Sequence, residues 1–351
     1  MTPTRVDPWS RKVMLEVQIM FNHDVERKIV AILHLLSQTR DPLGARELSR
    51  RLTDEGVFLT ERAVRYHLKI LDERGLTCSN GPNGREGRLI TDKGRDELSN
   101  ALVSDKVGLI STKIEALAFA MDFDPAVRGG RILLNTSLLP TASFPAAVEA
   151  MREVFKSKLC VSDLVAVKRE GELIGDTVVP RGYTGFGTMC SITVNGLLLK
   201  AGIPVESRFG GILQTLNGQP LRFTELIAYS GSSLDPMELF IRAKMTGVQD
   251  SARSGNGKTL ASFREIPAVC QPRAEEIFSG LAEAGIRGLI RFGEPSQEVC
   301  AVPVTRGRVG MIIIGGLNPI AAMAEAGTGI EYSAMSTLAE FSSLQSFWSL
   351  C

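Results

Sequence analysis

The chain of 351 residues is poor in histidine: His23, His34 and His67 are the only three, and none follows His67. A serine or cysteine nucleophile in the later part of the chain would have to take a histidine base from the first segment. Zinc sites built on histidine are nearly excluded there for the same reason. The commonest hydrolase and zinc-enzyme classes are therefore disfavoured for most of the chain.

Long apolar runs and strong net charge are also absent. No run of 18 or more apolar residues occurs, so we expect no membrane span. The first residues lack the pattern of a signal peptide, and the six cysteines form no CxxC pair, so reduced thiols in the cytoplasm are expected. A net charge of +1 means that any nucleic acid must be bound by a local patch. Neither a metal nor a bound cofactor is predicted.

The first hundred residues predict a winged helix-turn-helix. Segments 24–40, 45–56 and 60–75 carry apolar residues at helical spacing. Two short extended pieces then flank "NGPNGREG", which predicts a hairpin with arginine near its tip, and a further helix begins at Thr91. We assign this domain to residues 23–104, after an N-terminal extension over residues 1–22.

The third helix of this domain is the candidate DNA-reading element. Val64, Leu68 and Leu71 share its apolar face. The opposite face collects Arg62, Arg65, Tyr66 and Lys69. Such a helix enters the major groove of DNA, while Arg85 and Arg88 on the wing would reach phosphate or the minor groove. A solvated charged face, or a winged helix that docks on another protein, is the alternative.

From about residue 105 the pattern changes. Segments rich in β-branched residues alternate with helical stretches and with turns containing Gly and Pro. This predicts a mixed α/β domain over residues 105–351, so the fold class of the whole chain is α+β.

One phrase occurs twice in that domain. "AGIPVESRFGG" begins at Ala201 and "AGIRGLIRFGE" begins at Ala284, 83 residues later. We interpret this as an internal duplicated unit, roughly 160–245 and 246–330. A seam between two copies favours a ligand cleft.

The stretch "PRGYTGFGTMCSITVNG" suggests where a ligand would bind. Its glycines let backbone N–H groups approach an anion just before a predicted helix. The candidate effector-binding residues are Arg181, Thr188, Cys190, Ser191 and Arg208, with the two arginines as a clamp for a carboxylate. Alternatively, the glycines only permit tight turns, and Arg208 pins the two copies together. The residues alone leave both interpretations open.

Two further patterns concern catalysis. "ARSGNGKT" at 252–259 nearly matches a phosphate-binding loop, but Ala252 replaces the first glycine and no strand-loop-helix context surrounds it, so we interpret it as a hairpin tip. Cys190 at a helix N-terminus would have a lowered pKa and could serve a small-carboxylate enzyme fused to the DNA-binding module. Because no second motif supports a reaction, a non-enzyme is preferred.

Several stretches together resemble the NrpR family of nitrogen-regulation repressors, above all "RAVRYHLKILDERGL", "GTMCSITVNGLLLKAGIPVESRFGG" and "IIIGGLNPIAA". The resemblance covers about residues 24–350. It implies a homodimer whose winged helices bind double-stranded operator DNA. It also implies a regulatory domain in which 2-oxoglutarate, or a similar dicarboxylate, binds near Cys190 and relieves repression of nitrogen-assimilation genes. We therefore expect a ligand-responsive transcriptional repressor.

Overall fold

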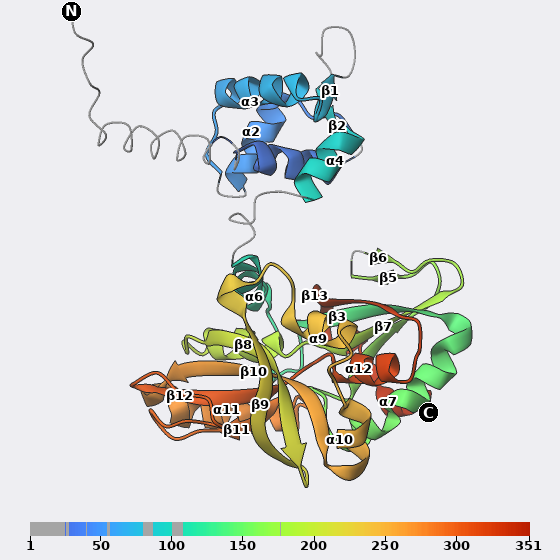
Figure 1. The fold of residues 1–351 in the computed structure, drawn as a ribbon, viewed down its shortest axis with the longest axis vertical. Coiled ribbons are helices and arrows are strands. Elements are labelled where there is room, and N and C mark those ends of the chain that lie inside the picture. The colour runs from blue at the N-terminus through green and yellow to red at the C-terminus, as the bar shows by residue number, and fades with distance from the viewer. Residues whose placement is uncertain are drawn as a thin grey trace, which may run out of the picture. The chain divides into compact units, whose positions relative to one another are not determined.

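A computed structural model describes residues 25, 28–39, 41–54, 57–79, 87–99, 108–175 and 177–351. The chain divides into two compact units, Met1–Lys106 and Val107–Cys351 (Figure 1). The predicted wing residue Arg85 lies outside the described residues.

The first unit is a winged helix. In chain order it contains a helix over residues 28–37, α2 (Ala45–Asp54), α3 (Glu61–Glu73), β1 (Thr77–Ser79), β2 (Arg88–Ile90) and α4 (Asp92–Ser99). The Thr60 hydroxyl caps α3 by accepting the Ala63 N–H, and Gly75 follows α3 with φ of 71°. Apolar side chains from all three leading helices, among them Leu33, Leu48 and Leu68, form one core. The predicted order of elements is confirmed.

The second unit begins with α6 (Leu109–Ala120) and contains two antiparallel five-stranded sheets (Figure 1). The first sheet has the order β13 (Glu331–Glu340), β3 (Arg131–Pro140), β7 (Tyr183–Met189), β4 (Leu164–Lys168), β14 (Gln345–Ser346). The second has the order β11 (Leu289–Phe292), β12 (Arg308–Ile314), β10 (Gly257–Pro267), β8 (Glu206–Leu216), β9 (Gln219–Ala228). The longer helices are α7 (Phe144–Lys156), α8 (Ile192–Lys200), α9 (Pro236–Arg242), α10 (Val248–Ser254), α11 (Gln271–Glu283) and α12 (Asn318–Glu325). A small hairpin joins β5 (Leu173–Ile174) to β6 (Thr177–Val178).

The internal duplication is present, but its period differs from the predicted one. The order β3-α7-β4-β7-α8-β8 recurs as β10-α11-β11-β12-α12-β13. Matching bonds fix the equivalence: the Cys190 N–H donates to the Leu133 carbonyl at 2.8 Å, and the Gly315 N–H donates to the Leu260 carbonyl at 2.8 Å. Equivalent residues thus lie 125 to 127 positions apart rather than 83. The expected boundaries at 160–245 and 246–330 are wrong.

The repeated phrase marks the ends of two non-equivalent helices, α8 and α11. In each, the glycine takes a positive φ, 77° at Gly202 and 80° at Gly285. The following isoleucine is buried and donates its N–H at 2.9 Å to the carbonyl five residues earlier. This is the Schellman motif, which satisfies the free carbonyls at a helix C-terminus. The phrase recurs because two helices end in the same way. Arg208 on β8 and Arg291 on β11 therefore occupy non-equivalent positions in the two halves.

The two halves interlock by exchanging their last helix and strand. β8 pairs with β10 of the second half, and β13 pairs with β3 of the first. Accordingly α8 packs with α11 on the β10–β12 face, through Val194, Ala274 and Met311. α12 packs with α7 on the other sheet, and the two helices lie side by side in Figure 1. The exchange brings the N-terminal ends of α8 and α12 to the seam between the halves, where the Thr188 hydroxyl donates to the Gly316 carbonyl at 2.9 Å.

Segment 252–259 spans the end of α10 and the start of β10. The order is helix, loop, strand, which is the reverse of a phosphate-binding loop. The rejection of that motif therefore stands, whereas its interpretation as a hairpin tip is wrong.

Candidate functional site

Helix α3 presents the predicted face to solvent. Arg62, Arg65, Tyr66 and Lys69 are all exposed, with Tyr66 at 61%. Arg65 forms an ion pair with Glu61, and Lys69 Nζ lies 3.8 Å from a Glu73 oxygen. These exposed pairs are worth about 0–1 kcal/mol, so phosphate can replace the carboxylates at little cost.

Arg88 has a different position from the one predicted. Its side chain is only 22% exposed, and its Nε lies 2.7 Å from the Asp72 carboxylate at the end of α3. The Thr77 hydroxyl donates to the same carboxylate at 2.6 Å. Arg88 thus joins the base of the wing to α3. We assign it to holding the wing in place, and its expected contact with DNA stays a prediction.

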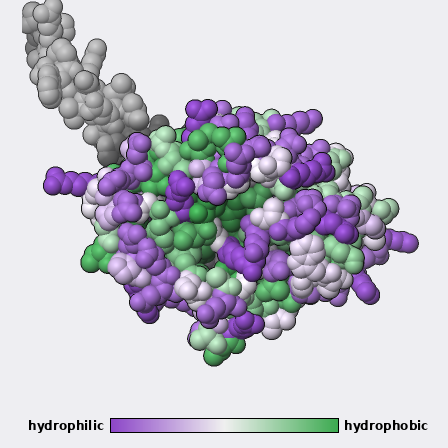
Figure 2. Space-filling model, turned by 90° about the horizontal axis from the view of Figure 1, so that it is seen from below, coloured by the Kyte–Doolittle hydropathy of each residue, from purple (hydrophilic) through white to green (hydrophobic). Residues whose placement is uncertain are grey.

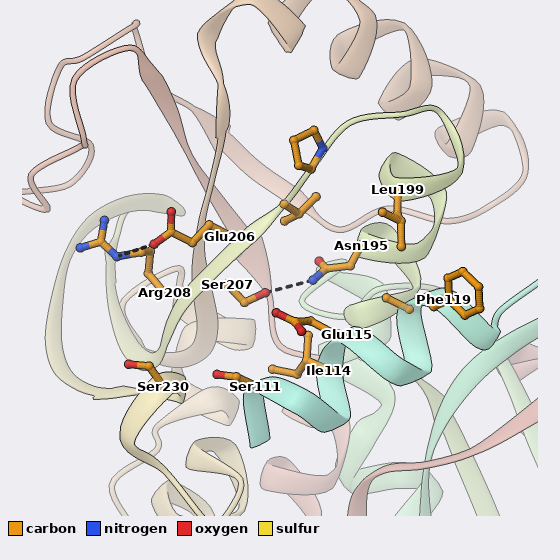
Figure 3. Close-up of a pocket in the computed structure, with 13 residues that line it drawn as sticks. Ser111, Ile114, Glu115, Phe119, Asn195, Leu199, Glu206, Ser207, Arg208 and Ser230 are labelled. Carbon is orange, nitrogen blue, oxygen red and sulfur yellow. Dashed lines mark hydrogen bonds and ion pairs between the residues drawn. The ribbon is translucent and has the colours of Figure 1, made fainter. Parts of the chain in front are cut away.

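The second unit contains a cleft of about 660 Å³ between α6, α8 and β8 (Figure 3). Ile114, Phe119 and Leu199 supply apolar walls. The polar lining consists of Ser111, Glu115, Asn195, Glu206, Ser207, Arg208 and Ser230. Figure 3 shows Glu206 and Arg208 at one end of the cleft, with Phe119 and Leu199 at the other. The volume lies within the range of small-molecule sites, about 300–1,000 Å³.

Arg208 is the cleft's most prominent cation, but its charge is already matched. Its Nη1 lies 2.5 Å from Oε1 of Glu265, a residue with no exposed surface. Arg308 Nε approaches the other Glu265 oxygen at 3.4 Å. Because a buried carboxylate is stable only with such partners, Arg208 serves first to neutralise Glu265.

The clamp expected from Arg181 and Arg208 is not formed. Arg181 is exposed in the turn before β7, at the end of the strand opposite to Thr188. Arg208 lies on β8 in the other sheet and lines the cleft, which Arg181 does not. The prediction is wrong because both arginines belong to one continuous stretch of sequence, whereas the fold places Arg181 in a turn beside one sheet and Arg208 on a strand of the other.

The residues before α8 are buried at the seam. Cys190 and Ser191 line a hollow of only about 20 Å³, and Thr188 is buried beside it. Burial raises the pKa of Cys190 to about 11, so the thiol is protonated at neutral pH. The lowered pKa expected of a nucleophile is therefore wrong, which removes the chief residue of the enzyme alternative.

Sequence reasoning missed Arg264 on β10. This residue has no exposed surface, and its guanidinium donates to the Ser191 carbonyl at 3.0 Å, to the Ser191 hydroxyl at 2.8 Å and to the Asn195 side-chain oxygen. Burial lowers the pKa of Arg264 to about 10. The available signal was the charged pair in "LASFREIP", an arginine and a glutamate inside an otherwise apolar strand.

Among the described residues, no helix is both long and apolar enough to cross a bilayer. No group of three or more potential metal ligands comes together in the same part of the chain.

Comparison with known proteins covers both units. Residues 107–346 match the family described as "NrpR regulatory domains NRD1 and 2", and residues 30–98 match "Ribonuclease R winged-helix domain". The chain is 36% identical over 326 residues to the "Global nitrogen regulator NrpRI" of Methanosarcina mazei, covering 93% of this chain and 99% of that protein. It is 31% identical over 316 residues to the "Global nitrogen regulator NrpR" of Methanococcus maripaludis, covering 90% of this chain and 54% of that longer protein.

A solved structure agrees with these matches. The crystal structure of a nitrogen repressor-like protein from Methanococcus jannaschii gives a TM-score of 0.58 at 26% identity, covering 69% of this chain and 98% of that chain. The relatives are named as regulators, which agrees with the expectation of a non-enzyme. The family match over residues 107–346, together with the relative that aligns over nearly its whole length, shows that this chain belongs to the NrpR family of nitrogen regulators.

Proposed function

We propose that this protein is a transcriptional repressor of nitrogen-assimilation genes that releases operator DNA when a small dicarboxylate binds, with 2-oxoglutarate as the effector to test first. One observation carries the proposal: the 660 Å³ cleft is walled by α6. This helix is the first described element after the boundary between the two units. A ligand in the cleft therefore contacts the segment that leads to the DNA-reading unit.

The winged helix supplies the DNA contact. The exposed cations Arg62, Arg65 and Lys69 would meet phosphate or base edges in the major groove, and Tyr66 lies among them. Two copies of the chain would read half-sites about 34 Å apart, one helical turn of DNA.

A surface of the second unit supports the homodimer. β9 is an edge strand of 10 residues, and its Leu221 and Leu226 are 45% and 56% exposed. Uncovered edges and exposed apolar side chains are typical of surfaces that pair with another chain. Figure 2 shows further apolar surface gathered in a hollow on the face seen from below.

The cleft also supports regulation by a small molecule. Its hydroxyl and amide groups can bind carboxylate and keto oxygens, while α6 forms one wall and α8 another. A shift of α6 that changes DNA affinity by about 5–150-fold requires a coupling of only ~1–3 kcal/mol.

Fluorescence anisotropy with a duplex selected from a random library by the full chain tests this function. We expect sub-micromolar binding that weakens at least fivefold at saturating 2-oxoglutarate. Analytical ultracentrifugation of the same sample should show a dimer. An operator affinity that is unchanged by 2-oxoglutarate and by related dicarboxylates would contradict the proposal.

A further inference from the structure

Arg264 is a buried cation without a carboxylate partner. It has no exposed surface, and in the described part of the chain no Asp or Glu lies within ion-pair distance of it. Its acceptors are one carbonyl, one hydroxyl and one amide oxygen, and its Nε has no partner among the described residues. A buried charge that lacks a counter-charge is destabilising, so its presence calls for a physical reason.

The neighbouring carboxylate does not serve as this partner. Glu265 follows Arg264 on β10, and successive side chains of a strand point to opposite faces. Glu265 is bound instead by Arg208 and Arg308. The two adjacent charged residues thus belong to separate environments, and only the carboxylate is neutralised by opposite charge.

The duplicated half shows that the fold does not require this cation. The matched bonds at Cys190 and Gly315 align the two halves residue by residue. Ser137, Gly316 and Ile320 stand in the other half at the positions of Arg264, Ser191 and Asn195. The same packing is therefore built there with no charged group. The polar cluster in one half alone indicates a role in binding rather than in folding.

One partner of Arg264 lies in the wall of the cleft. Asn195 lines the 660 Å³ cleft and donates its amide N–H to the Ser207 hydroxyl at 3.0 Å (Figure 3). Ser191, the other partner, lines the small hollow at the seam. The Asn195 side chain thus faces the cleft and also contacts the buried guanidinium.

We propose that Arg264 receives a carboxylate group of the effector, which enters from the cleft and displaces the Asn195 amide oxygen. The inference rests on the proposed function and names the cation that binds the ligand's charge. A carboxylate is the stronger acceptor because its bonds to guanidinium are charge-assisted, and a bidentate pair would also satisfy the unpartnered Nε. No proton is transferred, since both groups are charged at neutral pH.

Displacement of the Asn195 side chain would also shift α6. Gly196 follows Asn195 on the side of α8 that packs against α6, where an added Cβ would lie 2.8 Å from the Ala118 carbonyl oxygen. A shift of α8 at Asn195 therefore presses on the helix that leads to the DNA-reading unit. Arg264 would thus bind the ligand, and the displaced Asn195 with its neighbour Gly196 would transmit the change to α6.

The variant Asn195→Asp tests the assignment in the full chain. It places a permanent carboxylate where the amide oxygen now accepts from Arg264. We expect a higher melting temperature and at least a tenfold loss of 2-oxoglutarate affinity in calorimetry. Arg264→Gln should lose the affinity as well but lower the melting temperature. Asn217→Asp, the same substitution in the exposed β8–β9 turn, is the matched control and should bind as the parent does.

Formate, the smallest carboxylate, separates this inference from the proposed effector. Formate should raise the melting temperature of the parent more than chloride at equal ionic strength, and should not do so for Asn195→Asp. If the parent does not bind 2-oxoglutarate but shows this formate effect, 2-oxoglutarate is not the effector and the Arg264 site is supported. If Asn195→Asp and Arg264→Gln bind 2-oxoglutarate as tightly as the parent, the Arg264 site is refuted and the proposed function survives. A parent that responds to neither compound refutes both.

Discussion

Replacing Arg208 by methionine should destabilise the second unit through Glu265. The substitution retains much of the apolar stem but removes the guanidinium 2.5 Å from a carboxylate that has no exposed surface. Breaking a buried pair costs about 3–5 kcal/mol because the remaining charge is left uncompensated. Arg308 still approaches Glu265 at 3.4 Å, and the Arg208 side chain is 38% exposed. Both facts reduce the expected loss to ~2–3 kcal/mol.

Urea unfolding of the full chain, followed by tryptophan fluorescence and circular dichroism, measures this loss. Trp348 lies in the short 3-10 helix Phe347–Leu350, outside the two five-stranded sheets, so circular dichroism is the primary signal. The double variant Arg208→Met with Glu265→Gln should recover most of the stability, because the buried carboxylate is then neutral. A loss below about 0.5 kcal/mol in the single variant, or no recovery in the double variant, would refute the account of Glu265 as a buried charge that needs Arg208.

Three further predictions concern other parts of the molecule. Arg65→Ala should weaken DNA binding and reduce the slope of log affinity against log salt by about 1 if Arg65 contacts phosphate, and an unchanged salt titration would remove that contact. Gly196→Val should destabilise the chain, because its Cβ would meet the Ala118 carbonyl oxygen at 2.8 Å. The variant should still bind DNA through α3 but should no longer release it when the effector is added. Normal effector release from DNA would contradict the α8–α6 contact. Burial raises the pKa of Asp235 from 3.8 to about 6, so its contribution to stability is present below pH 3.8 and is lost as pH rises through 6. The melting temperature of the parent relative to Asp235→Asn should accordingly fall between pH 4 and 7, and a rise over that range would reverse the assigned sign.

The sequence predicted well where local chemistry decides the structure. The predicted helical segment 60–75 contains α3, whose ends are set by the Thr60 hydroxyl cap and by the left-handed Gly75, both within a few residues of the helix. The exposed face of α3 followed from helical spacing alone. These features depend on neighbours along the chain, so no tertiary information was needed.

Features that depend on long-range packing were not predicted. The phrase around Ala201 and Ala284 suggests a duplicated unit from sequence alone because a shared helix-ending motif imitates a repeat. The true duplication is hidden by divergence of the two halves, as at Arg264, whose equivalent is Ser137. Arg264 itself escaped notice because only the packed sheet shows that this arginine lacks a carboxylate.

The central claim is that a ligand in the cleft and DNA on the winged helix oppose each other. Calorimetric titration of 2-oxoglutarate into the full chain, alone and saturated with its selected duplex, tests this most directly because linkage makes the coupling reciprocal. The account predicts that DNA weakens 2-oxoglutarate binding by the same factor, at least fivefold, by which 2-oxoglutarate weakens DNA binding. Equal 2-oxoglutarate affinities with and without DNA would contradict it.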